Sequence, residues 1–281
     1  MINTAKQIAK KSNSSFYYAF KLLPPEKRDA MNTVYAFCRE TDDIVDNVSA
    51  SLDVKYEKLR KWRIEFEKAF SGHSEYSLLN KLGTTISKFN IPLDPFFELI
   101  RGMEMDLQKN RYLTFDDLSL YCYRVASTVG LMCIEIFGYK HKSTKEYAIN
   151  LGIAFQLTNI LRDINKDAND GRIYLPQEDL AKFDYSEKAL MEKTYNSNFK
   201  ELMEYETKRA QFYFDKANQI IQLDDKPSLF AARAMQRIYA RTLDKIVAED
   251  YNVFEKNISV LFFEKLGISI GAWAKYSLVY T

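Results

Sequence analysis

Glycine and proline are scarce in this sequence, which has nine glycines and six prolines among 281 residues. Globular proteins use roughly 12% of their residues for these two types, and tight turns between short strands depend on them. Hydrophobic residues make up 47% of the chain and charged residues 28%, which is enough apolar material for a core and is not typical of disorder. We therefore predict an all-α protein built from long helices with brief connections.

Hydrophobic residues recur with helical spacing along most of the chain. Prolines, glycines and capping residues such as Thr114 and Gly138 separate the periodic segments. No internal repeat, low-complexity segment or linker interrupts them, so we expect one helical domain over residues 1–281. Helices are predicted over residues 24–48, 52–70, 77–89, 95–110, 114–137, 144–169, 187–223 and 228–249.

The charge balance and the apolar runs limit the partners and the location that can be expected. The net charge is +2 without a basic tract, so nucleic acid is not an expected partner. The first residues lack the apolar stretch of a signal peptide. The best apolar runs, 148–161 and 258–263, are shorter than the ~18 residues of a membrane span or are interrupted by Asn and Gln. We expect a cytoplasmic protein without a transmembrane segment, and peripheral contact with the inner membrane face stays open.

The three cysteines, Cys38, Cys122 and Cys133, are odd in number and lack a paired spacing. Each is surrounded by apolar residues, which is typical of reduced, buried thiols rather than of disulfides or metal ligands.

A first polar stripe lies in the predicted helix 24–48. Tyr35, Arg39, Asp42 and Asp46 are spaced by four, three and four residues, which places them on one helical face between apolar rows. Aspartate costs roughly 0.5 kcal/mol relative to alanine in a helix interior, and Asp43 adds a third carboxylate within five residues. Neighbouring carboxylates repel one another, so we infer that a bound cation offsets the repulsion.

A second polar stripe follows about 120 residues later. Gln156, Asn159, Asp163 and Asp167 again share one face of a predicted helix, with apolar residues around them. Amide side chains among apolar rows are costly unless they meet partners or ligands. Two helices with inward polar stripes could face each other across a cavity.

The chemistry of these stripes suits a divalent cation and a diphosphate. Mg²⁺ prefers oxygen ligands and commonly shares its shell with substrate phosphates, and Arg39, Arg162 and Arg172 can neutralise phosphate oxygens. We infer metal-triggered loss of diphosphate to give an allylic carbocation, which needs a dry pocket with aromatic walls. The 19 tyrosines and 19 phenylalanines supply material for such a pocket.

Other sites fit the sequence less well. Asp163, Asn165 and Asp167 match the start of a calcium-binding EF-hand loop, but Ala168 and Tyr174 stand where that loop needs glycine and a bidentate glutamate. The two histidines, His73 and His141, lie in polar segments and are expected at the surface. No Ser-His-Asp, Cys-His or glycine-rich phosphate-loop pattern is present in the sequence.

Five motifs in order make the sequence resemble the bacterial squalene/phytoene synthase family. They are SFYYAF at 15–20, YAFCRETDDIVD at 35–46, GMEMD at 102–106, YCYRVASTVG at 121–130, and the segment 156–176, which ends in GRIYLP. Within the family, the stretches LLPPEKRDAM, GMEMDL and LTNILRDI are most similar to presqualene diphosphate synthases, and dehydrosqualene synthases are also similar.

The resemblance implies a class I isoprenoid synthase fold, a helical bundle around a central cavity, and it implies roles for individual residues. Asp42, Asp46, Asp163 and Asp167 match residues that bind Mg²⁺ and diphosphate, together with Asn159 as a metal ligand. Where many relatives carry a small residue, this chain has Arg124, and the effect on the pocket is left open. The positions that match substrate contacts are Ser15, Tyr35, Arg39, Gln156, Asn159, Arg162, Arg172 and Tyr239, and those that match the cavity lining are Phe16, Tyr123, Val129 and Gly130.

The implied reaction is a Mg²⁺-dependent head-to-head condensation of two prenyl diphosphates, with Mn²⁺ as a substitute ion. One substrate ionises and the double bond of the second attacks, which gives a cyclopropylcarbinyl diphosphate of the presqualene type. Two farnesyl diphosphates are the first expectation and two geranylgeranyl diphosphates, as in a phytoene synthase, are the alternative. Use of NADPH stays open. A terpene cyclase or chain-elongating synthase of the same fold, and a helical scaffold without catalysis, are weaker alternatives.

Overall fold

The computed structural model describes residues 19–47 and 49–278, with side chains as far as Tyr276. Within these ranges the regular secondary structure is helical. No β-strand is present there, and an isolated β-bridge joins Arg111 to Ile173. The helices are α3 (Pro25–Asp46), α4 (Leu52–Lys68), α5 (Ser77–Phe89), α6 (Asp94–Gln108), α7 (Phe115–Cys122), α8 (Thr128–Phe137), α9 (Ser143–Asn169), α10 (Gln177–Lys182), α11 (Glu187–Met191), α12 (Ser197–Ile220), α13 (Phe230–Ala248) and α14 (Phe262–Leu278). The predicted all-α class is confirmed, whereas the single domain over residues 1–281 stays a prediction.

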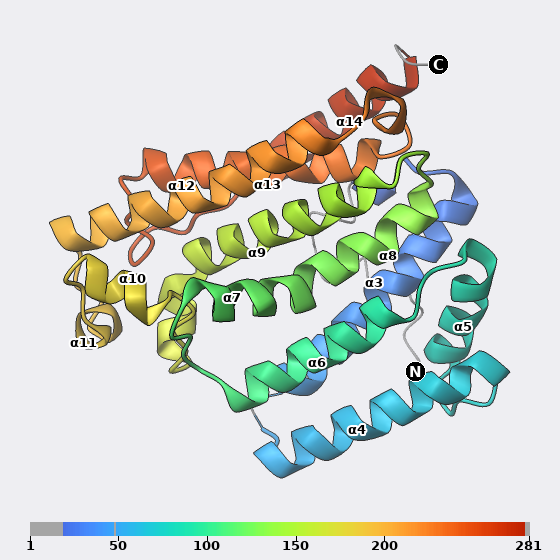
Figure 1. Cartoon of the computed structure of the whole chain (residues 1–281), viewed down its shortest axis with the longest axis horizontal. Helices are drawn as coiled ribbons and strands as arrows, with labels where there is room; N and C mark the ends of the chain where they lie inside the picture. Colours follow the sequence, from blue (N-terminus) through green and yellow to red (C-terminus); the bar gives the residue numbers. More distant parts are fainter. Residues whose placement is uncertain (1–18, 48, 279–281) are drawn as a thin grey trace.

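Helix α9 forms the centre of the bundle. In Figure 1 it runs between α12 and α13 on one side and α7 and α8 on the other. Helices α3 and α6 pack against α8, and α4 and α5 lie beyond them. One continuous cluster of buried hydrophobic side chains joins these layers, and it includes the tilted and edge-to-face rings of Phe37, Phe66 and Phe96. The apolar stripes predicted from helical spacing therefore face a common core.

Local capping signals place several helix ends where the sequence predicts them. The hydroxyl of Thr114 accepts a hydrogen bond from the backbone N–H of Asp117 and so begins α7. Helix α8 ends at Gly138, whose φ of 80° lies in the left-handed region that glycine adopts without strain. Helix α5 has the predicted bounds, 77–89. These ends depend on residues within one turn, so the sequence is sufficient to find them.

The C-terminal third differs from the prediction. The expected helix over 187–223 is divided into α11 and α12, because Lys193 takes a left-handed φ of 57° and Asn196 caps a new start by accepting from Phe199 N–H. The helix expected over 228–249 begins at Phe230. Two helices that the sequence analysis missed, α10 and α14, complete this part of the chain.

The segment predicted as one helix over 114–137 contains a π-helical turn, Tyr123–Ser127, between α7 and α8. Two glycines allow neighbouring helices to approach this turn. A Cβ placed on Gly152 of α9 would lie 2.4 Å from Ser127 Cα, and one on Gly102 of α6 would lie 2.8 Å from Val125 Cγ1. π-Turns inside α-helices frequently occur at functional sites, and this one is held tightly by backbone contact from α9.

The same segment is long and apolar enough to cross a membrane when only length and composition are considered. It is the 23-residue stretch Phe115–Phe137, within which an 18-residue window has a mean hydropathy of 1.3. The expectation that no run approaches a membrane span was therefore too strict. Half of its apolar window is buried inside the protein, as is common in the core helix of a globular protein.

The prediction of reduced thiols is confirmed for all three cysteines, but the prediction of burial holds for Cys122 and Cys133 and not for Cys38, which is only partly buried. Cys38, Cys122 and Cys133 are free thiols, of which Cys122 and Cys133 are buried. Burial raises the pKa of each thiol, to about 12 for Cys133. Protonated thiols are poor nucleophiles, so these residues act as small apolar side chains in the core.

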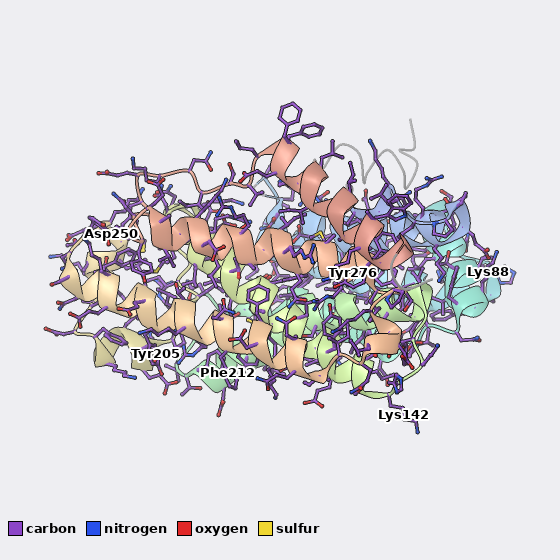
Figure 2. The ribbon with its side chains drawn as sticks, turned by 90° about the horizontal axis from the view of Figure 1, so that it is seen from above. Lys88, Lys142, Tyr205, Phe212, Asp250 and Tyr276 are labelled. Carbon is purple, nitrogen blue, oxygen red and sulfur yellow. The ribbon has the colours of Figure 1, made fainter. Side chains whose placement is uncertain are left out.

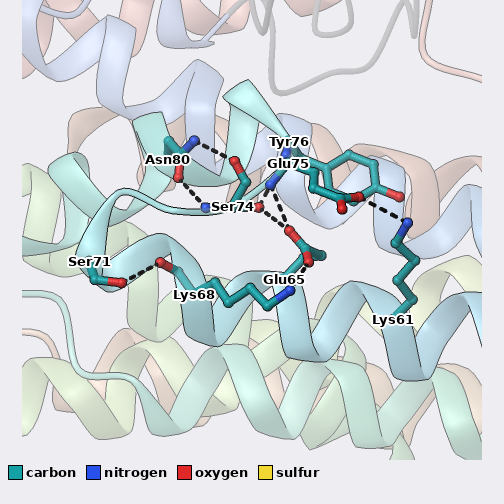
Figure 3. A network of polar contacts seen from close by, with 8 residues as sticks. All are labelled: Lys61, Glu65, Lys68, Ser71, Ser74, Glu75, Tyr76 and Asn80. Carbon is teal, nitrogen blue, oxygen red and sulfur yellow. Dashed lines mark hydrogen bonds and ion pairs between the residues drawn. The ribbon is translucent and has the colours of Figure 1, made fainter.

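A buried glutamate fixes the connection between α4 and α5. Glu65 is 1% exposed, and its carboxylate accepts hydrogen bonds from Ser74 Oγ at 2.9 Å, the backbone N–H of Glu75 at 2.7 Å and Lys68 Nζ at 2.7 Å. Figure 3 shows how these donors surround the carboxylate and how Asn80 closes the loop by bonding to the backbone of Ser74. The hydrogen bonds hold the pKa of Glu65 down to about 2, so the carboxylate stays charged over the range in which proteins function.

A second buried carboxylate secures the beginning of α9. Helix α9 starts without a side-chain cap from its own Lys142. Instead Asp225, which is fully buried, accepts hydrogen bonds from the backbone N–H groups of Lys140 and His141 and from Thr144 Oγ1. These donors lower the pKa of Asp225. The start of the central helix therefore depends on a residue that lies beyond the end of α12.

A third buried group joins α10 to α12. The guanidinium of Arg209 donates to Asp179 Oδ2 at 2.7 Å and to Glu206 Oε1 at 2.6 Å, and both carboxylates are almost fully buried. One arginine thus faces two acids. Burial, with a further contribution from Asp179, raises the pKa of Glu206 to about 8 in spite of the opposing effect of Arg209.

We expect Glu206→Gln to flatten the pH dependence of stability. The folded pKa of Glu206, about 8, is raised above its ordinary value of 4.5, so the folded state keeps a proton that the unfolded chain releases as the pH rises. Stability from this group is therefore complete at low pH and is lost as the pH approaches 8. The difference in unfolding free energy between the variant and wild type should therefore shift in favour of the variant as the pH is raised from about 5 to about 8.

The measurement is the thermal midpoint of unfolding at several pH values, followed by circular dichroism. Glu201→Gln, an exposed change on the same helix, is the matched control and should leave the wild-type profile unchanged. A parallel pH profile for Glu206→Gln and wild type would contradict the raised pKa.

Candidate active site

The two polar stripes lie on α3 and α9, and Arg172 connects them. Arg172 follows the end of α9, and its Nη1 atom lies 3.9 Å from Asp46 Oδ1 on α3. Its charge also lowers the pKa of Asp167, although burial and Asp163 raise that pKa more. The C-terminal halves of both helices therefore meet around one cation, as the sequence analysis expected for stripes that face each other.

Each stripe carries its own arginine. On α3, Arg39 donates to Asp42 Oδ2 at 3.0 Å and pairs with Asp43 Oδ1 at 2.5 Å. On α9, Arg162 forms a bidentate pair with Asp163, at 2.8 Å from Nε and 2.5 Å from Nη2. Arg39 therefore pairs with two neighbouring carboxylates, those of Asp42 and Asp43.

The carboxylates outnumber the cations that face them. Burial is the main cause of a raised pKa for Asp42, to about 6, and Asp46 adds to it while Arg39 opposes it. Burial likewise raises the pKa of Asp167 to about 7, with Asp163 as the next cause. A site whose partly buried carboxylates have raised pKa values favours an additional positive charge.

A further carboxylate, Asp106 of α6, belongs to the same site. Tyr121 Oη donates to Asp106 Oδ2 at 2.8 Å and Tyr174 Oη donates to Oδ1 at 2.9 Å. Asp106 contributes to the raised pKa of Asp42. Burial raises the pKa of Asp106 itself, although its hydrogen bonds from the two tyrosines and the charge of Arg172 oppose this effect. The sequence analysis quoted Asp106 inside a motif but gave it no role, because nothing in its spacing connects it with the two stripes.

A cavity of about 200 Å³ adjoins the carboxylates. Six of the residues that the sequence analysis predicted as substrate contacts or cavity lining border this cavity, and they come from α3, α8, α9 and α13. These are Tyr35, Val129, Gly130, Gln156, Asn159 and Tyr239. The other walls are almost entirely apolar and include Met31, Val34, Phe137, Leu151 and Phe155.

The cavity and the carboxylates occupy successive turns of the same helices. On α3 the lining residues Met31 to Cys38 precede Asp42, and on α9 the lining residues Tyr147 to Asn159 precede Asp163. Because each residue advances a helix by about 1.5 Å, the acidic groups stand one to two turns beyond the apolar pocket on both helices. The site thus has a charged end and an apolar end.

One predicted lining residue does not line the cavity. Tyr123 begins the π-turn and is not among the residues that line the cavity. Burial raises its pKa, and the charges of Glu98 and Asp94 on α6 raise it further, which places its hydroxyl near α6. The extra residue in a π-turn changes which side chains face inward, so that Val125 and Ala126 border the cavity. Arg124 also faces α6, where its Nε donates to Glu98 Oε2 at 2.9 Å, and it does not alter the pocket.

Ser15 and Phe16, the remaining predicted substrate and lining residues, lie outside the described residues. The aromatic wall that the chemistry requires is present without them. Phe155 and Tyr239 stack with their ring centroids 4.2 Å apart, and both border the cavity. Tyr239 is also electrostatically close to Arg162 and Asp163, so this aromatic pair stands between the apolar and charged ends.

The donor set fits a hard divalent cation that is completed by other ligands. Among the residues that the structure describes, no three acidic, histidine or cysteine side chains are grouped closely enough to hold a metal ion by themselves. The buried Oδ1 atom of Asn159 has no hydrogen-bond partner and is a free oxygen ligand between the cavity and Asp163. Mg²⁺ usually takes only one or two carboxylates and fills its shell with water and phosphate oxygens.

Comparison with known proteins gives consistent matches over nearly the whole chain. A sequence profile of the squalene/phytoene synthase family matches residues 9–264. Phytoene synthase 1 of Arabidopsis thaliana, a chloroplastic protein, is 39% identical over 267 residues, covering 93% of this chain and 63% of its own length. The 15-cis-phytoene synthase of Synechococcus elongatus is 37% identical over 273 residues, covering 93% of this chain and 88% of its own.

Solved structures of similar proteins share the fold. A dehydrosqualene synthase in complex with a ligand superposes with a TM-score of 0.85 at 29% identity, covering 99% of this chain and 96% of its own. A squalene synthase from Alicyclobacillus acidocaldarius gives a TM-score of 0.80 at 27% identity, covering 88% of this chain and 95% of its own. These neighbours confirm the predicted helical bundle with its central cavity.

Proposed function

Because the chain belongs to the squalene/phytoene synthase family, whose members are prenyltransferases, we propose that it condenses two geranylgeranyl diphosphates head to head to form phytoene. The sequence analysis put two farnesyl diphosphates first and this reaction second. The order is now reversed, since the similar proteins from Arabidopsis thaliana and Synechococcus elongatus are phytoene synthases. The chain spans only 63% of the Arabidopsis protein's length but 88% of the cyanobacterial one.

The observation that carries this proposal is that one site combines a charged end with an apolar end. The facing carboxylates of α3 and α9, with Arg172 between them, suit a diphosphate and its counter-ions. The adjoining apolar cavity suits a prenyl chain. Neither half alone would indicate this substrate class, because acidic stripes bind many ions and apolar cavities bind many ligands.

The protein's own residues then account for binding and for exclusion of water. Arg39, Arg162 and Arg172 are placed to donate hydrogen bonds to diphosphate oxygens. Asp42, Asp46, Asp163 and Asp167, with Asn159, would hold Mg²⁺, for which Mn²⁺ is a substitute. Mg²⁺ bound there would neutralise the diphosphate and so favour its departure from the allylic carbon.

The apolar end of the site protects the cation that this departure leaves. Walls such as Val34, Leu151 and Phe155 offer neither a nucleophile nor a hydrogen-bonding partner that would hold water, and this protects the cation from quenching. The stacked rings of Phe155 and Tyr239 present π-electron density of the kind that attracts cations. We further propose a cytoplasmic location, at the inner face of the membrane.

Product analysis tests the proposal directly. The purified protein is incubated with geranylgeranyl diphosphate or farnesyl diphosphate and Mg²⁺, with and without NADPH, and the products are identified by mass. We expect phytoene from geranylgeranyl diphosphate and no requirement for NADPH. A squalene-type or dehydrosqualene product formed preferentially from farnesyl diphosphate would contradict the chosen substrate, and a cyclised product from one substrate would contradict the coupling.

A further inference from the structure

Helix α14 presents a row of large apolar side chains to solvent. Leu261, just before the helix, is 63% exposed, Phe263 is 80% exposed, Ile270 46% and Trp273 36%. Phe263 and Ile270 are two helical turns apart and Trp273 lies one turn further on, so the three share one side of the helix. We call these four residues the α14 ridge.

Helix α14 differs from an ordinary surface helix because it leaves several large apolar side chains in solvent, although its buried face includes Ala272 and Tyr276. A surface helix normally buries its apolar stripe and exposes its charged one. Here Ser269 and Ala272 are fully buried against the bundle, and Glu264 of the first turn faces α13, where Lys245 Nζ donates to it at 2.7 Å. Figure 2 shows α14 crossing the bundle beside α13, with Tyr276 labelled near its end.

The surface between the ridge residues is open. Among the described residues, no atom lies within 4 Å of the position that a Cβ would take on Gly267 or Gly271, which are both on α14. Monomeric proteins seldom expose a contiguous apolar row of this kind unless it contacts a partner or a membrane. An aromatic and aliphatic row on one helix face, with tryptophan included, is the pattern of helices that lie in a membrane interface.

The ridge lies beside the charged end of the active site. The segment just before α14, residues 253–258, forms a surface groove with α9 that contains Arg162 and Asp163. Lys265, in the first turn of α14, lies near Arg162. Burial lowers the pKa of Lys265, and the positive charge of Arg162 lowers it further. The groove carries the cations Arg162, Lys166 and Lys256 and the acids Asp163 and Glu255.

We propose that the α14 ridge seats the protein on the surface of a lipid bilayer, with its apolar side chains in the interface and the groove at the level of the phosphate headgroups. The apolar row matches the acyl boundary, and the cations beside it match anionic headgroups. A prenyl diphosphate in a bilayer has its tail among the acyl chains and its diphosphate at the surface, so it would meet the groove first. This last step rests on the proposed function.

Flotation with vesicles of phosphatidylcholine and phosphatidylglycerol tests the seating without substrate. We expect the full chain to float with the vesicles and the variant Phe263→Ser/Ile270→Ser to lose about tenfold in bound fraction. Phe212→Ser is the matched control, because Phe212 is 60% exposed on α12, on the side of the molecule away from α14 (Figure 2). The control should float like wild type.

Tryptophan fluorescence gives a second measurement. The chain has two tryptophans, and Trp62 is buried and hydrogen-bonded to Thr41, so Trp273 is the one able to respond to lipid. We expect its emission to move to shorter wavelength on addition of vesicles, to be quenched by brominated acyl chains, and to lose both responses in Trp273→Phe.

Three results would overturn the proposal: no flotation of the full chain, an equal loss in Phe212→Ser, or a dimer in sedimentation that Phe263→Ser/Ile270→Ser dissociates. The dimer would make the ridge a contact between two copies of the chain. Turnover is measured separately, with substrate dispersed in detergent, where the ridge variant should match wild type. Vesicle binding without turnover would count against the proposed function alone, and turnover without vesicle binding would count against this inference alone.

Discussion

Asp163→Asn is expected to reduce Mg²⁺-dependent release of diphosphate at least ~100-fold while the helical fold stays intact. The Asp163 carboxylate accepts two hydrogen bonds from Arg162 and lies on the stripe that faces Asp46 and Arg172. Asparagine keeps the shape but removes the negative charge and one acceptor. The substitution therefore weakens the electrostatic attraction for a divalent cation. It also removes one of the two hydrogen bonds that orient Arg162.

Release of diphosphate from geranylgeranyl diphosphate is the measurement, with far-ultraviolet circular dichroism and a thermal scan to check the fold. Asp215→Asn, an exposed change on α12, is the control for loss of one aspartate and should retain full turnover. Wild-type turnover in Asp163→Asn would remove Asp163 from the site and with it the metal assignment on α9.

Gly152→Ala is expected to destabilise the protein by about 1–3 kcal/mol or more and to reduce turnover. The new Cβ would lie 2.4 Å from Ser127 Cα and 2.6 Å from Ser127 N, and backbone atoms cannot rotate away as a side chain can. Relief requires α9 to separate from the π-turn. Because Val125 and Ala126 of that turn border the cavity, the same shift changes the shape of the pocket.

Urea unfolding gives the change in free energy, and Gly267→Ala is the matched control. Gly267 also lies within a helix, but a Cβ there meets nothing within 4 Å, so alanine should stabilise the protein by up to about 1 kcal/mol through helix propensity. Equal stability of Gly152→Ala and wild type would show that α9 can separate from the turn without cost.

The parts of the fold that the sequence predicts well are those whose signals are local. Helix α5 and the start of α7 are fixed by residues within one turn, such as the Thr114 cap. Helix α14 was missed because Gly267 and Gly271 interrupt its pattern and its large apolar residues face solvent. The break between α11 and α12 depends on a left-handed Lys193, a conformation that lysine does not signal.

The same distinction separates the predicted and the missed site residues. The stripes on α3 and α9 repeat every three to four residues, so helical geometry alone places Asp42 beside Asp46 and Asp163 beside Asp167. Asp106 owes its place to two tyrosines, 15 and 68 positions away, and only the folded chain brings them together. Tyr123 was misplaced because a π-turn shifts the face that a regular helix would present.

The buried Asp225 also sets an order of events during folding. Its three partners at the beginning of α9 precede it by 81 to 85 residues, so this end of the helix cannot be tied down until α12 has been made and has folded back. Closing a loop of that length costs entropy before any contact repays it. During synthesis, the helix that carries Asp163 and Asp167 would therefore emerge early, but its beginning would be fixed only late. A chain that stops before Asp225 would hold these groups on a frayed helix.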